Sequence, residues 1–196
     1  MRNGTKQVVA CLGAAAAFML VPAATLAAEA SLGVDVASSY VWRGQVVNDD
    51  AVAQPSLDVS SESGLGLNVW GNFDLTDDKV SGRESSEFSE VDLTVTYDLN
   101  LGDECPVDVQ VGLIEYLFPK EGDFSDTTTG SSAVDADTRE IFVGLSDSVS
   151  GFDVSVTGYL DIDEVDGAYV NAAIEHAVPV AEELGLVASA SVGYGT

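Results

Sequence analysis

Residues 90–99, with the sequence EVDLTVTYDL, alternate strictly between polar and apolar side chains. Successive side chains of an extended strand point to opposite faces, so one face here is apolar and the other carries acidic and hydroxyl groups. A helix, with about 3.6 residues per turn, would mix the two kinds around its surface. The stretch therefore predicts a β-strand that separates an apolar from a polar environment.

The same alternation recurs along most of the chain and predicts an all-β protein of about nine antiparallel strands with almost no helix. The predicted strands cover residues 31–42, 56–60, 65–73, 90–99, 107–113, 140–145, 153–161, 169–175 and 186–194. In the first predicted strand, the residues expected on the apolar face are Leu32, Val34, Val36, Tyr40 and Trp42.

The predicted connections alternate between two kinds. The mostly long and polar kind lies at residues 45–54, 74–86, 119–137 and 163–167. The shorter kind lies at residues 62–64, 100–106, 147–151 and 178–183. Long loops at one edge and short turns at the other are typical of outer-membrane barrels, whereas a soluble β-sandwich normally contains Greek-key crossovers. We therefore predict an antiparallel up-and-down transmembrane β-barrel.

The N-terminal segment has the layout of a secretory signal peptide. Arg2 and Lys6 precede an uncharged, apolar-rich run from Val8 to Ala28. Its strongly apolar core is shorter than the roughly 20 residues that a membrane-spanning helix needs. The sequence therefore predicts a cleaved signal peptide over residues 1–28, with cleavage near Ala27 or Ala28, and a single barrel domain over residues 29–196.

The chain is strongly acidic, with 33 Asp and Glu residues against 7 Lys and Arg residues and a net charge of −26. Such a field repels nucleic acid and attracts cations, so no nucleic-acid partner is expected. A heavily solvated or salt-adapted surface is the simplest reason for the charge. The acidic run from Asp161 to Asp166 does not have calcium-loop spacing, because Val165 stands where the third oxygen ligand belongs. We expect no metal and no cofactor.

Signals of enzymatic activity are few. His176 is the only histidine of the chain, and a serine-histidine-aspartate arrangement would need it as the general base. Its predicted place near the end of a strand favours a structural role. We expect that the protein is not an enzyme.

The polar face of the predicted strands is the candidate functional surface, because in a barrel it would line the lumen. The residues predicted to line a pore are Asp35, Asp58, Asn68, Glu90, Asp92, Asp108, Gln110, Glu140, Asp153, Asp161, Asn171 and Glu175. Arg43 and Arg139 are the basic residues close to these strands. We expect each to pair with lumen carboxylates and so to brace or partly close the channel.

Several short motifs resemble the TorF family of porins. They are Ser39–Gln45 (SYVWRGQ), Gln54–Leu57 (QPSL), residues 64–66 leading into Asn68–Asn72, Glu90–Leu93 followed by Tyr97, residues 112–119 and Glu140–Leu145. The resemblance covers most of the predicted barrel in order and spacing. It implies an exported outer-membrane protein and supplies no catalytic residues. Members of that family continue to a final aromatic strand, which barrel-assembly machinery recognises.

This sequence instead ends at Tyr194, Gly195 and Thr196, and the predicted strand number is odd where single-chain bacterial barrels have even numbers. We therefore expect further strands to be missing at the C-terminal end. The leading functional expectation is a passive outer-membrane channel for small hydrophilic solutes, with a preference for cations. Its partners would be outer-membrane lipid, the assembly machinery and the solutes themselves, with homo-oligomers left open. The alternatives are a non-conducting structural or interaction barrel and a secreted soluble β protein.

Overall fold

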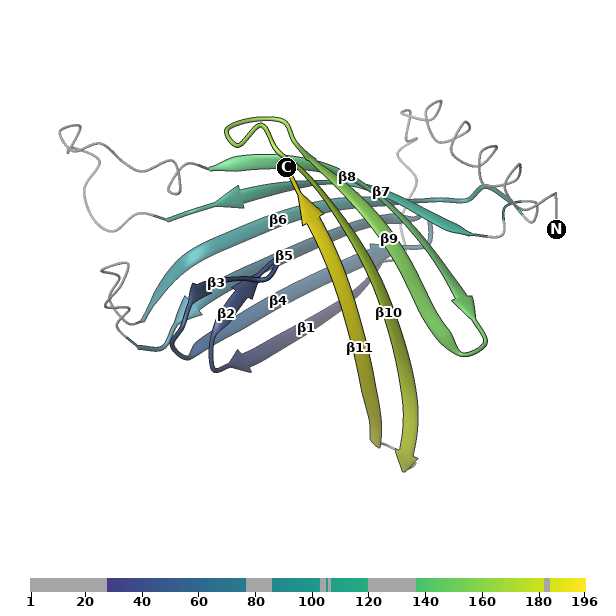
Figure 1. Ribbon diagram of the computed structural model, residues 1–196, viewed down its shortest axis with the longest axis horizontal. Coiled ribbons are helices and arrows are strands. Elements are labelled where there is room, and N and C mark those ends of the chain that lie inside the picture. Colours follow the sequence, from purple (N-terminus) through teal and green to yellow (C-terminus); the bar gives the residue numbers. More distant parts are fainter. Residues whose placement is uncertain (1–27, 77–85, 103–104, 106, 120–136, 182–183) are drawn as a thin grey trace.

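The computed structural model describes residues 28–76, 86–102, 105, 107–119, 137–181 and 184–196 (Figure 1). The signal peptide predicted over residues 1–28 thus lies almost wholly outside the described residues, as do residues 77–85 and 120–136 of two predicted loops. The strands are β1 (Ala28–Ala37), β2 (Tyr40–Trp42), β3 (Gln45–Asn48), β4 (Val52–Ser61), β5 (Leu65–Asp74), β6 (Glu87–Leu99), β7 (Asp108–Leu117), β8 (Thr138–Val149), β9 (Phe152–Asp161), β10 (Ala168–Ala181) and β11 (Leu184–Gly195).

Nine of these strands form one antiparallel sheet in the order β1-β4-β5-β6-β7-β8-β9-β10-β11. From β4 onward every strand pairs with the next one along the chain, which is the predicted meander. The sheet curves strongly into a half-barrel, with β1 and β11 as its two edges (Figure 1). The all-β antiparallel prediction is confirmed. No described residue belongs to a helix with the length and apolar character needed to cross a membrane.

The connections lie alternately at the two edges of the meander, and the expected alternation of lengths holds only in part. Connections at residues 75–86, 118–137 and 162–167 join strands at one edge, and they include the two longest ones. Connections at residues 62–64, 100–107, 150–151 and 182–183 join strands at the other edge, but 100–107 is longer than 162–167.

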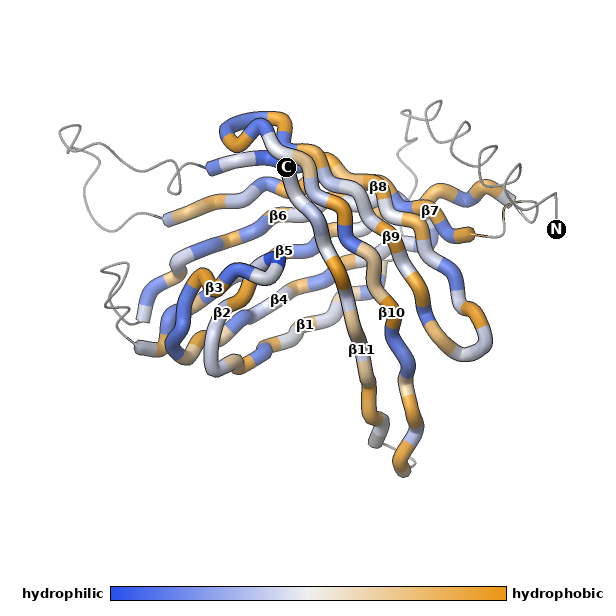
Figure 2. Tube along the Cα trace, viewed as in Figure 1, coloured by the Kyte–Doolittle hydropathy of each residue, from blue (hydrophilic) through white to orange (hydrophobic). Residues whose placement is uncertain are grey.

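Cross-strand register extends the alternation of residues 90–99 over the whole sheet. Asp58 pairs with Asn68, Asn68 with Thr94, Thr94 with Ile114, and Ile114 with Glu140. Directly opposed residues of antiparallel strands share a face, so such rows run across the sheet. Hydrophilic and hydrophobic residues accordingly alternate along the strands (Figure 2).

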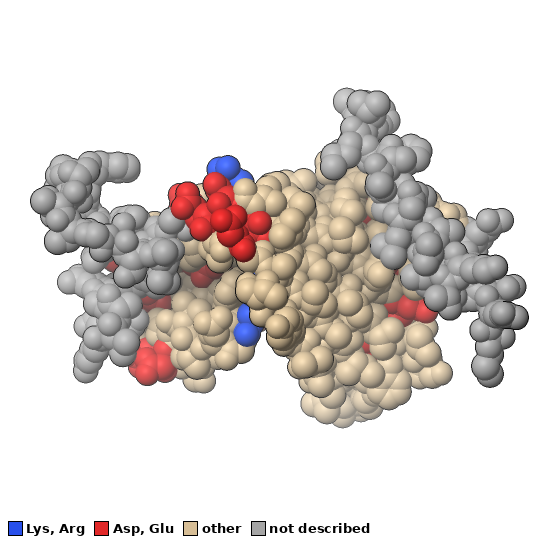
Figure 3. Space-filling model, turned by 45° about the horizontal axis from the view of Figure 1, so that its top comes forward, with Lys and Arg blue, Asp and Glu red and all other residues tan. Residues whose placement is uncertain are grey.

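The burial pattern is inverted relative to that of a water-soluble globular protein. Among the described residues, eight polar or charged residues are buried, against four hydrophobic ones. Leu32 is 84% exposed, and Leu93, Ile141 and Ile174 on the convex face are also exposed. Figure 3 shows a broad surface without charged side chains. The polar groups therefore gather inside the curve and the apolar side chains outside it.

The prediction for the first strand was wrong in its second half. The strand ends at Ala37, and residues 40–48 instead form the separate hairpin β2–β3. Tyr40 and Trp42 thus do not continue the apolar face of β1, and the loop predicted over residues 45–54 contains β3 and the start of β4. Figure 1 shows the hairpin in front of β4–β6, on the side toward which the sheet curls. The physical reason is the set of contacts that the hairpin makes inside the curve.

Close packing on the concave face depends on Gly112 in β7. Its register partner across the sheet is Phe142 of β8. A Cβ atom added at Gly112 would lie 2.4 Å from Phe142 Cε1 and 2.9 Å from the carbonyl oxygen of Val95. The ring therefore occupies the space that a side chain at position 112 would need.

We predict that Gly112→Ala lowers the free energy of unfolding by about 1 to 3 kcal/mol, because the Phe142 ring and the backbone must shift. Urea unfolding of the refolded full-length chain measures the change. The matched control is Gly158→Ala, because a Cβ at Gly158 meets nothing within 4 Å. Equal stability of the two variants would contradict the described packing.

Candidate functional site

The polar residues predicted to line a pore lie together on the concave face of the sheet. They share this face because opposed residues of paired strands, and residues two apart within one strand, point to the same side of the sheet. The set comprises Asp35, Asp58, Asn68, Glu90, Asp92, Asp108, Gln110, Glu140, Asp153, Asp161, Asn171 and Glu175. Period-two alternation thus brings carboxylates from seven strands to one surface.

A tight turn puts Arg43 at the tip of the β2–β3 hairpin. Trp42 pairs with Gln45, so Arg43 and Gly44 form a two-residue loop. Their φ angles are 49° and 82°. Two successive positive φ values are the mark of a type I′ turn, which suits the twist of a hairpin. A non-glycine residue in this region is uncommon, so contacts of the Arg43 side chain must compensate for its backbone conformation.

The guanidinium of Arg43 forms a bidentate ion pair with Glu140 of β8. Nη1 donates to Oε1 at 2.7 Å and Nη2 donates to Oε2 at 2.5 Å. The Tyr116 hydroxyl donates to the same Oε2 at 2.8 Å. The side chains of Arg43 and Glu140 are only 14% and 7% exposed. A partly buried, two-point pair of this kind is stronger and more directional than a surface ion pair.

Aromatic rings enclose the same guanidinium. The Arg43 Cζ atom lies 4.3 Å from the ring centroid of Trp42, 4.6 Å from that of Tyr159 and 4.4 Å from that of Tyr169. Each distance is within the range of a cation-π interaction. Burial lowers the pKa of Arg43, but the hydrogen bond and the charge of Glu140 raise it further, leaving it above its usual value. We call this arrangement of Trp42, Tyr159, Tyr169 and Glu140 the arginine cage.

The far end of the hairpin is anchored by a buried hydrogen-bond network. Asn48 Nδ2 donates to Oδ1 of Asp74 at 2.8 Å, and Asn72 Nδ2 donates to the same atom at 3.0 Å. Asn72 Nδ2 also donates to the Ser89 hydroxyl at 2.8 Å. Because all four residues are buried, loss of any one partner would leave a polar group without compensation.

Two ring contacts join the hairpin to the sheet between these anchors. The rings of Tyr40 and Trp70 are 5.5 Å apart, and those of Trp42 and Tyr116 are 6.2 Å apart in an edge-on arrangement. Such pairs add stability beyond simple area burial. The hairpin is therefore held at its tip, its middle and its base.

Open hollows remain on the concave face around the hairpin. One of about 510 Å³ lies between the hairpin and β4–β7, with Trp70 and Asp92 in its wall. A second of about 680 Å³ lies between the hairpin, β7 and β9–β11, beside the arginine cage. A third of about 480 Å³ is lined by Asp108 and Gln110. Carboxylates and amides thus line hollows that can hold water at three places on the concave face.

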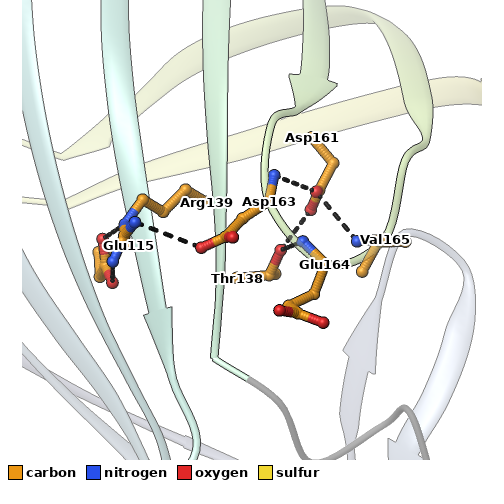
Figure 4. Close-up of polar contacts among 7 residues, drawn as sticks. All are labelled: Glu115, Thr138, Arg139, Asp161, Asp163, Glu164 and Val165. Carbon is orange, nitrogen blue, oxygen red and sulfur yellow. Dashed lines mark hydrogen bonds and ion pairs between the residues drawn. The ribbon is translucent and has the colours of Figure 1, made fainter.

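Arg139 does not join this group. It is the register partner of Glu115, and both side chains lie on the convex face of the sheet. Its guanidinium binds the Glu115 carboxylate and lies 3.3 Å from Asp163 Oδ2 (Figure 4). Its side chain is 50% exposed. Adjacent residues of a strand point to opposite faces, so Arg139 and Glu140 face opposite sides of the sheet.

Asp161 has a structural role in the loop after β9. Its Oδ1 accepts hydrogen bonds from the backbone N–H groups of Asp163 and Val165 at 3.0 and 3.1 Å (Figure 4). The hydroxyl of Thr138 donates to its Oδ2 at 2.7 Å.

Figure 3 shows a cluster of acidic side chains on the surface of the molecule. Within the described residues, no group of three or more His, Cys, Asp or Glu side chains is placed to hold a metal ion.

His176 braces the turn between β8 and β9. Its Nδ1 lies 2.7 Å from the carbonyl oxygen of Gly151, and its ring stacks on Phe152 with centroids 4.6 Å apart.

The arginine cage was not among the features predicted from the sequence. The sequence did contain one indication of it. Along their strands, Tyr116, Tyr159 and Tyr169 occupy positions in step with the polar residues, which places their rings on the concave side.

Residues 23–196 match a family model described as "Bacterial protein of unknown function (Gcw_chp)". No curated protein and no solved structure matches the chain.

The ion pair at the tip of the hairpin gives a measurable prediction. In a double-mutant cycle of Arg43→Gln and Glu140→Gln, we expect a coupling free energy of about 1 to 3 kcal/mol, because both partners are largely buried and share two hydrogen bonds. The free energy of unfolding in urea is measured for the wild type, both single variants and the double variant.

The matched control is the cycle of Arg139→Gln and Glu115→Gln. We expect a smaller coupling there that falls further as salt is added, because water and ions screen an exposed pair. A coupling at Arg43 and Glu140 no larger than this control would show that the ion pair does not hold the hairpin.

Proposed function

The chain belongs to the Gcw_chp family of bacterial proteins of unknown function, and we propose that it is an outer-membrane channel for small hydrophilic solutes that prefers cations. The observation that carries the proposal is the inverted distribution of side chains. Charged and amide groups face the concavity, while apolar side chains cover the convex surface.

The convex surface supports contact with lipid. Leu32 and Val192 are 84% and 71% exposed, and Val143 and Leu160 also expose large parts of their side chains. Exposed apolar area costs about 25 cal/mol per Å² in water, and a bilayer removes that cost. The strands of the main sheet have 10 to 14 residues, enough to cross a bilayer at the usual tilt. Between neighbouring strands of the sheet the backbone hydrogen bonds are satisfied, as a membrane requires, whereas β1 and β11 each have one edge without a partner strand among the described residues.

The concave surface supports a channel role. Its hollows measure about 480 to 680 Å³, and carboxylates border two of them, with Asp92 in the wall of one and Asp108 in the wall of the other. Arg43 is the basic residue that the described part of the chain places on this face, and Glu140 neutralises it. An acidic lumen favours cations over anions.

The outer membrane is the proposed location for three reasons. The N-terminal segment resembles a signal peptide, the motifs resemble those of TorF-family porins, and the two longest connections of the meander lie at the same edge of the sheet. The proposed partners are outer-membrane lipid and barrel-assembly machinery.

A second candidate function is a structural barrel that does not conduct. The observation that favours it is the β2–β3 hairpin, which occupies part of the concavity and is held at both ends. Small barrels commonly fill their interiors with side chains.

Planar-bilayer recording of the full-length chain separates these two functions. We expect discrete conductance steps and, across a potassium chloride gradient, a reversal potential that favours K⁺ over Cl⁻, because carboxylates border the path. Silent bilayers with demonstrated insertion would support the structural barrel instead. Anion selectivity would contradict the proposed lumen.

A pair of adjacent substitutions tests membrane embedding. Leu93 lies on the convex face and Thr94 on the concave face near the middle of β6. We expect Leu93→Arg to lower the free energy of unfolding of lipid-embedded protein by about 2 to 4 kcal/mol, because it places a charge in hydrocarbon. Thr94→Arg should have a much smaller effect, because it points toward a polar hollow. If both variants unfold at the same urea concentration, the convex face does not contact lipid.

A further inference from the structure

The hollow between the hairpin and β4–β7 has an unusual wall. Its volume is about 510 Å³, and three aromatic side chains line it: Tyr40 and Trp42 from the hairpin and Trp70 from β5. Asp92 of β6 also lines it, and Asp92 is the register partner of Trp70. A carboxylate therefore lies beside several electron-rich rings.

The Asp92 carboxylate is incompletely satisfied. Its Oδ1 atom is fully shielded from solvent and has no hydrogen-bond partner among the described residues. A buried acceptor without a donor costs free energy, and an ionised one costs more. Glu90 lies two residues away on the same face of β6 and adds negative potential. A positively charged group in the hollow would offset the negative potential of these two carboxylates.

The arginine cage shows that a carboxylate beside aromatic rings binds a guanidinium in this protein. It combines a carboxylate, Glu140, with the rings of Trp42, Tyr159 and Tyr169 around a guanidinium. Trp42 belongs to both places, because it also lines the hollow beside Asp92. The hollow thus repeats the chemistry of the cage on the other side of the hairpin.

We propose that this hollow binds small organic cations with a guanidinium head, with Asp92 as the anionic partner and Tyr40, Trp42 and Trp70 as the aromatic wall. The inference names the solute class of the proposed channel and rests on that function for its role in transport. The binding step itself rests on the hollow alone. The volume suits a small solute and leaves space for water.

The two tryptophans of the chain provide a direct readout. Trp42 and Trp70 are the only ones in the sequence, and both line the hollow. Full-length protein refolded in detergent micelles is titrated with butylguanidinium while intrinsic fluorescence is recorded. The control ligand is butylurea, which has nearly the same shape and no charge. We expect a saturable change with butylguanidinium and none with butylurea, because Asp92 and the rings select for charge.

Variants connect the signal to the carboxylate. We expect Asp92→Asn to weaken butylguanidinium binding roughly tenfold or more, as the loss of a charge-assisted hydrogen bond predicts. The matched control is Asp98→Asn, because Asp98 lies on the same face of the same strand, is exposed and does not line the hollow. Circular dichroism and urea unfolding verify that both variants fold.

Three results would overturn the proposal: no saturable response of the wild type, an equal response to butylurea, or the same loss of binding in both variants. Bilayer recordings keep this failure distinct from that of the channel. Binding without conductance would retain the site and reject transport, whereas conductance without binding would reject the site and retain the channel.

Discussion

The ion pair between Arg43 and Glu140 determines how the interior of the half-barrel is divided. Period-two alternation collects carboxylates on the concave face, and the hairpin brings a cation to them. Because the pair is bidentate and enclosed by rings, it fixes the tip of the hairpin against the far wall of the sheet. The hollows on either side exist because the hairpin is held between them. A polar network, with Asn48 and Asp74 at its centre, replaces the usual apolar core at the other end.

Much of the sheet could be predicted from the sequence, because strand pairing follows the alternation of side chains. Residues 90–99 form most of β6, and the predicted meander order is the observed one. The first predicted strand is the exception. Tyr40 and Trp42 keep the parity of Val36, so the polar Ser38 between Val36 and Tyr40 is the one sign in the pattern of the break after Ala37. The strand breaks there because the hairpin contacts residues far along the chain, such as Glu140 and Tyr159. Local alternation of side chains carries no information about such contacts.

Candidate site residues were predictable where parity alone decides their position. The twelve polar candidates share the concave face for this reason. Arg139 was expected to pair with them because it is a basic residue close to the predicted strands, but it faces the side opposite to its neighbour Glu140. The arginine cage was not predictable, because the meeting of Trp42, Tyr159 and Tyr169 depends on the curvature of the sheet and the placement of the hairpin.

The position of the hairpin also has a consequence for the order of folding. From β4 onward each strand pairs with its sequence neighbour, so the sheet can grow through closures of short loops. Arg43 instead meets Glu140, 97 residues further on, and its cage includes Tyr159 and Tyr169 from later strands. Contacts of such separation form late, after the local pairs that create their binding surface. The hairpin is therefore synthesised before the strands that hold it and docks near the end of folding, so the concavity stays open while the wall around it is assembled.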